Sequence, residues 1–311
     1  MGTMQAQKPL RKYCLIPATL TPMKADFEVD YEQLEDYVKW LVKHGIGGVA
    51  VNVDTGEGPH LYPEERASIL RLFSKIVAGR IPVIAGLHAR NTMEAVRLGL
   101  QAKEAGADGL LVFPHPAFVG EPNNHVVYNY HSEISEKVGL PMILFQLQPA
   151  LGGVDFKPET LLRLASIRSV IAIKEASFDA RKFVNVVHTL KKADRKIMIL
   201  TGNDNFIYES LVLGAEGGLL GFGTIAVEQQ VEMFNLIAKG RLAEAREIWE
   251  ELLPLEEAVF AQPVRDYRAR LKEALVMMGV LKTSYVRPPL QPVPSEEKEA
   301  IRKALKSLRL L

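Results

Sequence analysis

Short apolar runs alternate along the chain with longer segments in which hydrophobic residues recur at helical spacing. Most of these runs are continuous, which is typical of parallel strands that helices cover on both faces. The eight runs with the strongest strand pattern are CLIPATL, GGVAVNV, IPVIAGL, GLLVFP, PMILFQ, VIAIKEA, IMILTGN and GGLLGF. This succession predicts eight βα units.

The segments between the runs support the same reading. Residues 30–44 place Leu34, Val38 and Leu41 on one helical stripe, and residues 91–105 open with Asn91 and Glu94 at capping-box spacing. The sequences GIGG (45–48), GADG (106–109) and GAEG (214–217) each separate a helical segment from a strand, where glycine can supply a left-handed helix stop. Eight such units predict a (β/α)₈ TIM barrel, with a doubly wound open sheet as the alternative.

The last part of the chain has a different pattern. Residues 225–311 contain no further strand pattern, but helical segments cover residues 227–239, 242–253, 264–278 and 295–308. We therefore expect residues 1–224 to form the barrel that carries the active site. Residues 225–311 are expected to add the final barrel helix and a C-terminal helical subdomain.

Composition narrows the functional classes. The 311 residues carry a formal net charge of only +1, which gives no footprint for a nucleic-acid partner. No run of about 18 apolar residues occurs, so no membrane span is expected. The single cysteine, Cys14, excludes an internal disulfide and a cysteine-based zinc cluster. We expect a cytoplasmic protein without nucleic-acid or membrane partners.

Lys174 is the residue most suggestive of chemistry. It ends the apolar run IAIK, and in a barrel the strand ends carry the active site. Burial lowers the pKa of a lysine toward the neutral amine that attacks a carbonyl to form a Schiff base. The alternative is a structural lysine that reaches solvent or pairs with an acid. Other residues that follow the predicted strands are Asp54, Thr55, Gly56, His88, His115, Phe145, Gln146, Asn203 and Gly221.

Several motifs resemble the dihydrodipicolinate synthase and N-acetylneuraminate lyase family of class I aldolases. They are IPATLTP, TGE (55–57), GRIPVIAG (79–86), GADGLLVFP (106–114), IAIKEAS and TGND (201–204), together with the helical tail. The resemblance covers residues 15 to about 300 in the family's order and spacing. It implies a pyruvate-like 2-oxoacid held as an imine on Lys174, no cofactor, and a homotetramer built as a dimer of dimers. It also implies that Thr55 and Gly56 hold the substrate carboxylate in a turn of backbone N–H groups, although a plain turn would explain TGE as well.

The chain departs from this family at three positions, which makes it a divergent member. Phe145 stands where the family has a proton-shuttling tyrosine, Asp54 where it has a threonine, and Ala150 where the synthases carry an arginine for the distal carboxylate. Losing a positioned acid or base typically costs about 10² to 10⁴ in rate, so another group must take over if turnover is kept. Asp54, His88 and His115 are the substitute acid and base candidates.

Further candidates concern substrate binding. Phe145, Gln146, Asn203 and Gly221 are candidate substrate contacts, and the amides of Gln146 and Gln148 would suit the hydroxyls of a deoxy sugar acid. Structurally, both glutamines fit solvent-facing loop positions equally well.

The leading functional hypothesis is a lyase that acts on a 2-oxoacid through Lys174. It would cleave a 4-hydroxy-2-oxoacid by a retro-aldol reaction or dehydrate a 2-oxo-3-deoxy sugar acid. The alternatives are dihydrodipicolinate synthase proper, which joins pyruvate to aspartate semialdehyde, and a silent 2-oxoacid-binding homologue. A metal-dependent lyase using Asp54, Glu57, His88 or His115 is a further alternative, but these residues lack tight ligand spacing, so no metal is expected.

Overall fold

The computed structural model describes residues 9–119 and 124–311. Its eight strands are parallel and lie in the order β1-β8-β7-β6-β5-β4-β3-β2. A parallel bridge between Ala18 and Ala50 joins the two ends of the sheet and closes the barrel. The strands are β1 Leu15–Pro17, β2 Val49–Val51, β3 Val83–Leu87, β4 Gly109–Val112, β5 Met142–Leu147, β6 Val170–Ala176, β7 Met198–Thr201 and β8 Gly217–Leu220.

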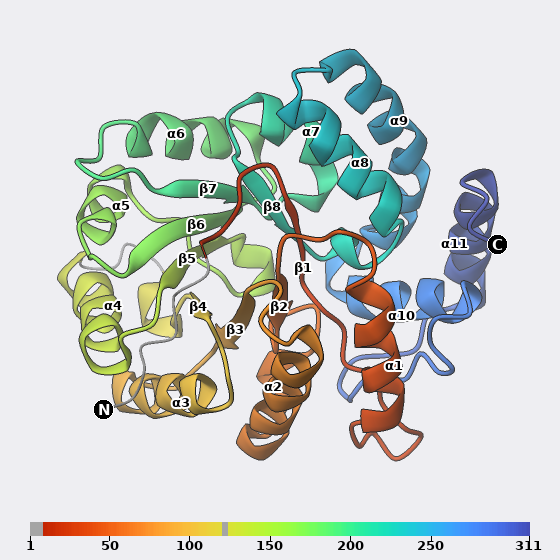
Figure 1. Ribbon diagram of the computed structural model, residues 1–311, viewed down its shortest axis with the longest axis horizontal. Coiled ribbons are helices and arrows are strands. Elements are labelled where there is room, and N and C mark those ends of the chain that lie inside the picture. Colours follow the sequence, from red (N-terminus) through yellow and green to blue (C-terminus); the bar gives the residue numbers. More distant parts are fainter. Residues whose placement is uncertain (1–8, 120–123) are drawn as a thin grey trace.

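Helices surround the strands (Figure 1). They are α1 Tyr31–Leu41, α2 Pro63–Val77, α3 Thr92–Glu104, α4 Asn124–Val138, α5 Pro158–Ala165, α6 Ala180–Leu190, α7 Ile207–Val212, α8 Val227–Ala238, α9 Leu242–Val259, α10 Tyr267–Met277 and α11 Ser295–Ser307. Single 3₁₀ turns follow several strands or precede helices: η1 Gly58–His60, η2 Pro116–Phe118, η3 Pro149–Leu151, η4 Asp204–Phe206, η5 Phe222–Thr224 and η6 Val264–Asp266. The predicted (β/α)₈ barrel with a C-terminal helical appendage is confirmed.

The local signals act as expected. Gly106 and Gly214, which end the helical segments before β4 and β8, have φ values of +96° and +122°. Only glycine adopts such angles without strain, so these residues allow the chain to turn back into the barrel. Asn91 accepts a hydrogen bond from the Glu94 N–H at 2.9 Å, as the predicted N-cap of α3 requires.

Strand alternation divides the core into two layers. Residues such as Ile16, Ile143, Ala172 and Leu200 fill the barrel interior, whereas their neighbours along the strands pack against the helices. The register of β5 and β6 pairs Phe145 with Lys174 and Gln146 with Glu175. Because side chains alternate along a strand, Phe145 and Lys174 share the interior face, and Gln146 and Glu175 share the other.

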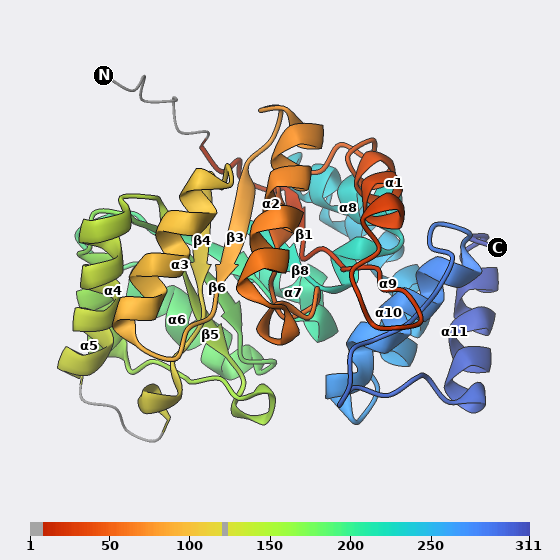
Figure 2. The same cartoon turned by 90° about the horizontal axis from the view of Figure 1, so that it is seen from below.

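The C-terminal helices pack on one side of the barrel. Helix α8 contacts β1 as the last helix of the barrel, and α9 packs on α8. Figures 1 and 2 show the C-terminal helices on the side of the barrel that carries α1. In the segment after α10, the Lys282 N–H donates to the side chain of Gln33 in α1, and the Thr283 hydroxyl donates to the Met23 carbonyl at 3.0 Å. The boundary at residue 224 stays a prediction. None of the helices in the described ranges is long and apolar enough to cross a membrane.

Candidate active site

Lys174 lies at the C-terminal end of the barrel with only 7% of its surface exposed. Its Nζ is 4.5 Å from the centre of the Phe145 ring, and no hydrogen bond or ion pair within the described ranges engages it. Burial lowers the pKa of Lys174 to about 8, against the opposing influence of the Asp204 and Asp54 charges. The amine is therefore desolvated without being tied to an acid, which is the state that favours nucleophilic attack on a carbonyl.

A small cavity surrounds the amine. It is lined by Asp54, Thr55, Phe145, Leu147, Leu151, Lys174, Ala176, Phe178, Gly202, Asp204, Gly221, Phe260, Val264 and Tyr267. Gly202 leaves room for the lysine, because a Cβ atom at this position would stand 2.5 Å from Lys174 Cε. Asp54, Thr55, Phe145, Gly221 and Lys174 of the predicted site thus meet around one cavity.

Asp54 follows β2 and is held by the C-terminal segment. Its Oδ2 accepts a hydrogen bond from the Tyr267 hydroxyl at 2.8 Å, and its Oδ1 forms an ion pair with Arg268. The Arg268 Nε also donates to the Asp54 carbonyl at 2.8 Å. The guanidinium offsets the negative charge that would otherwise repel a 2-oxoacid carboxylate in the same turn.

The turn after Asp54 is fixed by a buried ion pair. Glu57, in a left-handed conformation, pairs with Lys272, and both side chains are fully buried. The second oxygen of Glu57 accepts the Arg287 N–H at 2.8 Å, and the Arg287 guanidinium binds both carboxylate oxygens of Glu65 at 2.8 Å. These contacts from the C-terminal helical part hold residues 54–65, which follow β2, in place. We call them the clamp on the β2 turn.

The same turn presents free backbone donors. The Glu57 and Gly58 N–H groups are bound to the carbonyls of Asp54 and Val53, whereas those of Thr55 and Gly56 find no acceptor in the described part of the chain. The Gly56 carbonyl accepts the Thr21 hydroxyl at 2.8 Å, and a Cβ at Gly56 would stand 2.5 Å from the Thr19 carbonyl oxygen. Two adjacent, unpaired N–H groups in a fixed turn suit a carboxylate.

Asp204 is a further buried acid in the cavity. Burial raises its pKa to about 7, although the Phe222 N–H, which donates to it at 2.8 Å, and the Lys174 charge act in the opposite direction. The strand pattern places Asp204 at the end of β7, but the sequence alone gives no reason to choose it over Asn203.

Gln146 and Asn203 lie on the other face of the sheet. Their amides donate to the buried Glu175 carboxylate at 3.0 Å and 2.7 Å, and their oxygens accept the N–H groups of Phe156 and Phe178. Burial raises the pKa of Glu175, and these donors partly oppose that shift. Both amides are thus engaged in a structural cluster that does not line the cavity, so the geometry does not favour the predicted substrate contacts.

The two histidines also lie outside the cavity. The His115 ring binds the Arg90 carbonyl at 2.9 Å and the Ala117 N–H at 3.0 Å, so it caps η2. His88 packs edge-on against Phe113, which in turn packs edge-on against Phe145. Burial lowers the pKa of His88. Neither imidazole lines the cavity, so their predicted acid and base roles gain no support, whereas Asp54 keeps its place.

Tyr267 and Arg268 are the site residues that sequence reasoning missed. They begin α10, more than two hundred positions after the turn they bind. The pattern of residues 264–278 predicts only a helix, and nothing in it shows which part of the barrel the helix meets.

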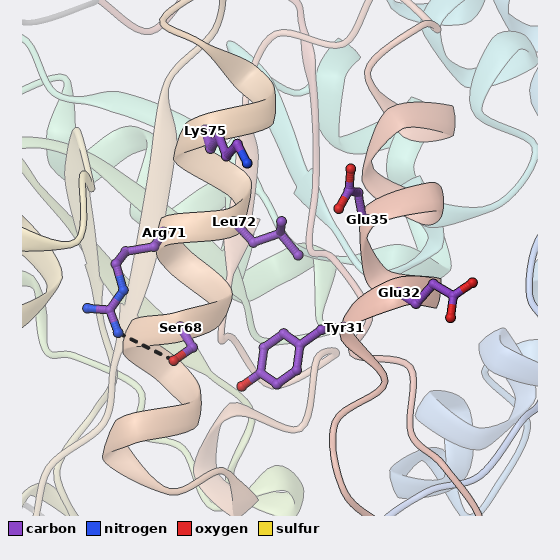
Figure 3. Close-up of a pocket in the computed structure, with 7 residues that line it drawn as sticks. All are labelled: Tyr31, Glu32, Glu35, Ser68, Arg71, Leu72 and Lys75. Atoms are coloured by element: carbon purple, nitrogen blue, oxygen red, sulfur yellow. Dashed lines mark hydrogen bonds between the residues drawn. The ribbon is translucent and has the colours of Figure 1, made fainter.

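The surface also carries a hollow outside the barrel. A wider, open hollow lies between α1 and α2 (Figure 3), lined by Tyr31, Glu32, Glu35, Ser68, Arg71, Leu72 and Lys75. It shares no residue with the cavity at Lys174 and has acidic groups on α1 opposite basic groups on α2. Across the described ranges, no three His, Cys, Asp or Glu side chains are grouped so that they could hold a metal ion.

Known proteins match the chain along nearly its whole length. A relative from Kosmotoga olearia, named 4-hydroxy-tetrahydrodipicolinate synthase, is 31% identical over 294 residues, which cover 94% of this chain and 97% of the relative. The crystal structure of dihydrodipicolinate synthase from Thermotoga maritima superposes with a TM-score of 0.88 at 30% identity, covering 97% of this chain and all of that one. The synthase from Acinetobacter baumannii, solved with pyruvate, gives a TM-score of 0.86 at 28% identity, covering 97% of this chain and all of that one.

The profile of the dihydrodipicolinate synthetase family matches residues 12–308. Together with the barrel and its buried lysine, this match confirms the predicted family. The chain belongs to the dihydrodipicolinate synthetase family and is an enzyme of its class I, lysine-dependent lyase type.

Proposed function

We propose that this enzyme acts on a 2-oxoacid through a Schiff base on Lys174. The observation that carries the proposal is a buried amine, with its pKa lowered to about 8, in a cavity lined also by Thr55. The backbone N–H groups of Thr55 and of the adjacent Gly56 find no acceptor within the described ranges. The amine attacks C2 of the oxoacid, the carbonyl oxygen leaves as water, and the resulting iminium withdraws electrons from C3.

The turn at Thr55 and Gly56 is the proposed binding site for the substrate carboxylate. Its N–H groups are free in the described ranges, and the Asp54 charge beside it is paired with Arg268. A carboxylate bound there would place C2 within reach of a lysine that lines the same cavity.

The remaining walls bear on the type of substrate. Gln146, the candidate partner for sugar hydroxyls, is bound to Glu175 and Phe156. Large apolar side chains, namely Phe145, Leu147, Leu151, Phe178, Phe260 and Val264, line the cavity beside the polar groups of Asp54, Thr55, Asp204 and Tyr267. A substrate hydroxyl that faces an apolar wall has no partner, so this lining favours making or breaking a C3–C4 bond over dehydration of a polyhydroxylated acid.

Reductive trapping tests the proposal. The enzyme is incubated with pyruvate and borohydride, and the peptide that contains Lys174 is analysed by mass spectrometry. We expect a reduced pyruvyl group on Lys174; folded enzyme that gives no adduct would contradict the proposal. Incubation with 4-hydroxy-2-oxoacids and with 2-oxo-3-deoxy sugar acids then separates the branches, since only the retro-aldol branch releases pyruvate.

One observation favours dihydrodipicolinate synthase proper as a second candidate, in agreement with the relatives' names. The family arginine for the distal carboxylate is replaced by Ala150, but the exposed Arg265 donates from its Nη2 to the Ala150 carbonyl at 3.1 Å. A guanidinium from η6 thus stands at the loop where the family supplies one from the β5 side.

Condensation of pyruvate with aspartate semialdehyde tests this candidate. If Arg265 binds the distal carboxylate, Arg265→Ala should raise KM for the semialdehyde by about ten- to hundredfold, the loss expected for a charge-assisted hydrogen bond. An aldehyde without a carboxylate is the matched control and should be unaffected. Wild-type enzyme that fails to condense the semialdehyde would exclude the synthase activity.

Two further properties of this enzyme stay predictions. They are its assembly as a homotetramer, built as a dimer of dimers, and its cytoplasmic location. Light scattering of the purified enzyme measures the number of subunits directly.

A further inference from the structure

Tyr267 reaches the cavity from outside the barrel. It is the first residue of α10, only 5% exposed, and its ring stacks on Phe260 with centres 5.1 Å apart and planes 17° apart. Gly221 makes room for it, because a Cβ there would stand 3.1 Å from Tyr267 Cε2 and 3.3 Å from Thr55 Oγ1. The position of the phenol is therefore fixed by packing on both sides.

The hydroxyl of Tyr267 has two hydrogen-bond partners. It lies 2.8 Å from Asp54 Oδ2 and 3.2 Å from Thr55 Oγ1. A phenol has a single proton, so when Tyr267 donates to the Asp54 carboxylate, Thr55 must donate to Tyr267. Since Arg268 holds the other oxygen of Asp54, the carboxylate is locked with one oxygen toward the phenol.

The cavity offers few other groups that move protons. Phe145 has none to give, and His88 and His115 do not line the cavity. Apart from Lys174 itself, the lining side chains that carry an acidic or hydroxyl group are Asp54, Thr55, Asp204 and Tyr267. Asp204 accepts a backbone N–H from Phe222, whereas Asp54 and Tyr267 are already joined by a hydrogen bond along which a proton can pass.

We propose that Tyr267 is a catalytic residue whose hydroxyl carries a proton between the imine-bound 2-oxoacid and Asp54. This assignment rests on the proposed Schiff base at Lys174. The family supplies the proton-transferring tyrosine from the strand position that Phe145 occupies here. In this enzyme the hydroxyl would come from the C-terminal helical part instead. Burial and the Asp54 charge raise the pKa of Tyr267 well above its usual range, so the phenol stays protonated and passes a proton on instead of storing a charge.

Two coupled proton transfers form the enamine. The C3 proton moves to the Tyr267 oxygen while the Tyr267 proton moves to Asp54 Oδ2. The electrons of the C3–H bond become the second bond between C2 and C3, and the iminium nitrogen takes up the C2–N pair, which gives the enamine. When C3 then attacks an aldehyde carbon, the aldehyde oxygen takes a proton from Tyr267, and Tyr267 recovers one from Asp54. Asp54 begins and ends the cycle as a carboxylate, and the cleavage reaction is the reverse.

Two measurements with pyruvate alone separate the steps. Borohydride trapping reports the imine on Lys174, and proton NMR in D₂O reports exchange of the C3 protons. In Tyr267→Phe, which keeps the ring and its stacking, we expect trapping close to that of the wild type and exchange slower by about 10² to 10⁴. Asp54→Asn, which cannot take up the proton, should show the same pattern.

Tyr130→Phe is the matched control. Tyr130 is also buried at 5% exposure but does not line the cavity, so losing its hydroxyl should change neither trapping nor exchange. Circular dichroism, which does not depend on the adduct, shows that each variant is folded.

The outcomes are distinct. Wild-type exchange in Tyr267→Phe with the adduct intact would overturn the proposal, as would loss of the adduct, because the phenol would then act before C3 becomes acidic. Absence of an adduct in the wild type would instead refute the proposed Schiff base.

Discussion

Lys174 and Lys272 are both deeply buried, and burial lowers the pKa of each. Their partners differ. Lys272 donates to the fully buried Glu57 and to the Tyr285 carbonyl at 2.7 Å, whereas Lys174 faces the ring of Phe145 and a cavity. The charges of Asp204 and Asp54 act on Lys174 only through electrostatic attraction, without a hydrogen bond or ion pair in the described ranges.

The difference separates a structural lysine from a reactive one. A buried ammonium with a carboxylate and a carbonyl on it stays charged and holds two segments together. A buried amine without a direct partner loses its proton near neutral pH and keeps its lone pair available. Burial alone therefore does not identify a nucleophile; the absence of a direct acceptor within the described part of the chain does.

The largest expected effect concerns Lys174→Met. We expect no pyruvyl adduct and a fall in turnover on the order of 10⁴-fold or more, since the covalent intermediate is lost. Trapping and a steady-state assay measure both. Lys272→Met, examined under conditions where it is folded, should still form the adduct. An adduct lost in Lys272→Met but kept in Lys174→Met would show that Lys272, and not Lys174, is the reactive lysine.

The next effect concerns stability. Lys272→Met leaves Glu57 charged and buried and should lower the free energy of unfolding by about 3 to 5 kcal/mol, measured by denaturant titration. Lys174→Met should act in the opposite direction at pH 7. The folded pKa of Lys174, about 8, lies below the unfolded value of 10.5, so the unfolded chain binds more protons between these values.

Because the folded pKa is the lower one, Lys174 lowers the free energy of unfolding at neutral pH by up to about 3 kcal/mol. This destabilisation disappears above about pH 10.5. A Lys174→Met variant less stable than the wild type at pH 7 would contradict this.

The pH dependence of labelling sharpens the comparison further. Acetic anhydride modifies neutral amines, so labelling of Lys174 should rise tenfold per pH unit and level off near pH 8, whereas exposed lysines continue to rise toward about pH 10.4. Peptide mass spectrometry measures both classes in one sample. Lys272 should stay unlabelled in the folded enzyme, and labelling of Lys272 at the rate of Lys174 would remove the distinction.

The smallest effect concerns the space beside Lys174. Gly202→Ala puts a Cβ 2.5 Å from Lys174 Cε and 2.9 Å from Ala176 Cβ, so the lysine must shift, and adduct formation should slow by about tenfold. Gly240→Ala is the control: its Cβ meets nothing within 4 Å and it does not line the cavity, although its φ of +74° adds backbone strain. It should leave adduct formation unchanged; a Gly202→Ala enzyme that traps pyruvate at the wild-type rate would show that the lysine position tolerates this shift.

The barrel was predictable because its signals are local. Continuous apolar runs, Asn91 at the start of α3, and glycines such as Gly106 act over a few neighbouring residues. Lys174 at the end of β6 was likewise predictable as a candidate, since a lysine after a buried apolar run must be either desolvated or paired with an acid. Alternation also explains Gln146, because it pairs with Glu175 in the sheet and thereby shares its face.

The rest of the site depends on contacts that local pattern does not encode. Asp54 was recognised as a candidate, but its partners Tyr267 and Arg268 come from α10, and the position of that helix depends on its packing against α9 and α11. His88 and His115 end the expected strands, yet ring packing and backbone bonds direct them away from the cavity.

The clamp on the β2 turn has a consequence for recombination between relatives. Asp54 and Glu57 come from the N-terminal half of the chain, while Tyr267, Arg268 and Lys272 come from the tail. A chimera that joins this barrel to a tail without counterparts of Tyr267, Arg268 and Lys272 would keep its strands and its lysine but would lose both ion pairs and the phenol together. The two parts must therefore be inherited as a matched set, and substitutions in one constrain those that the other can accept.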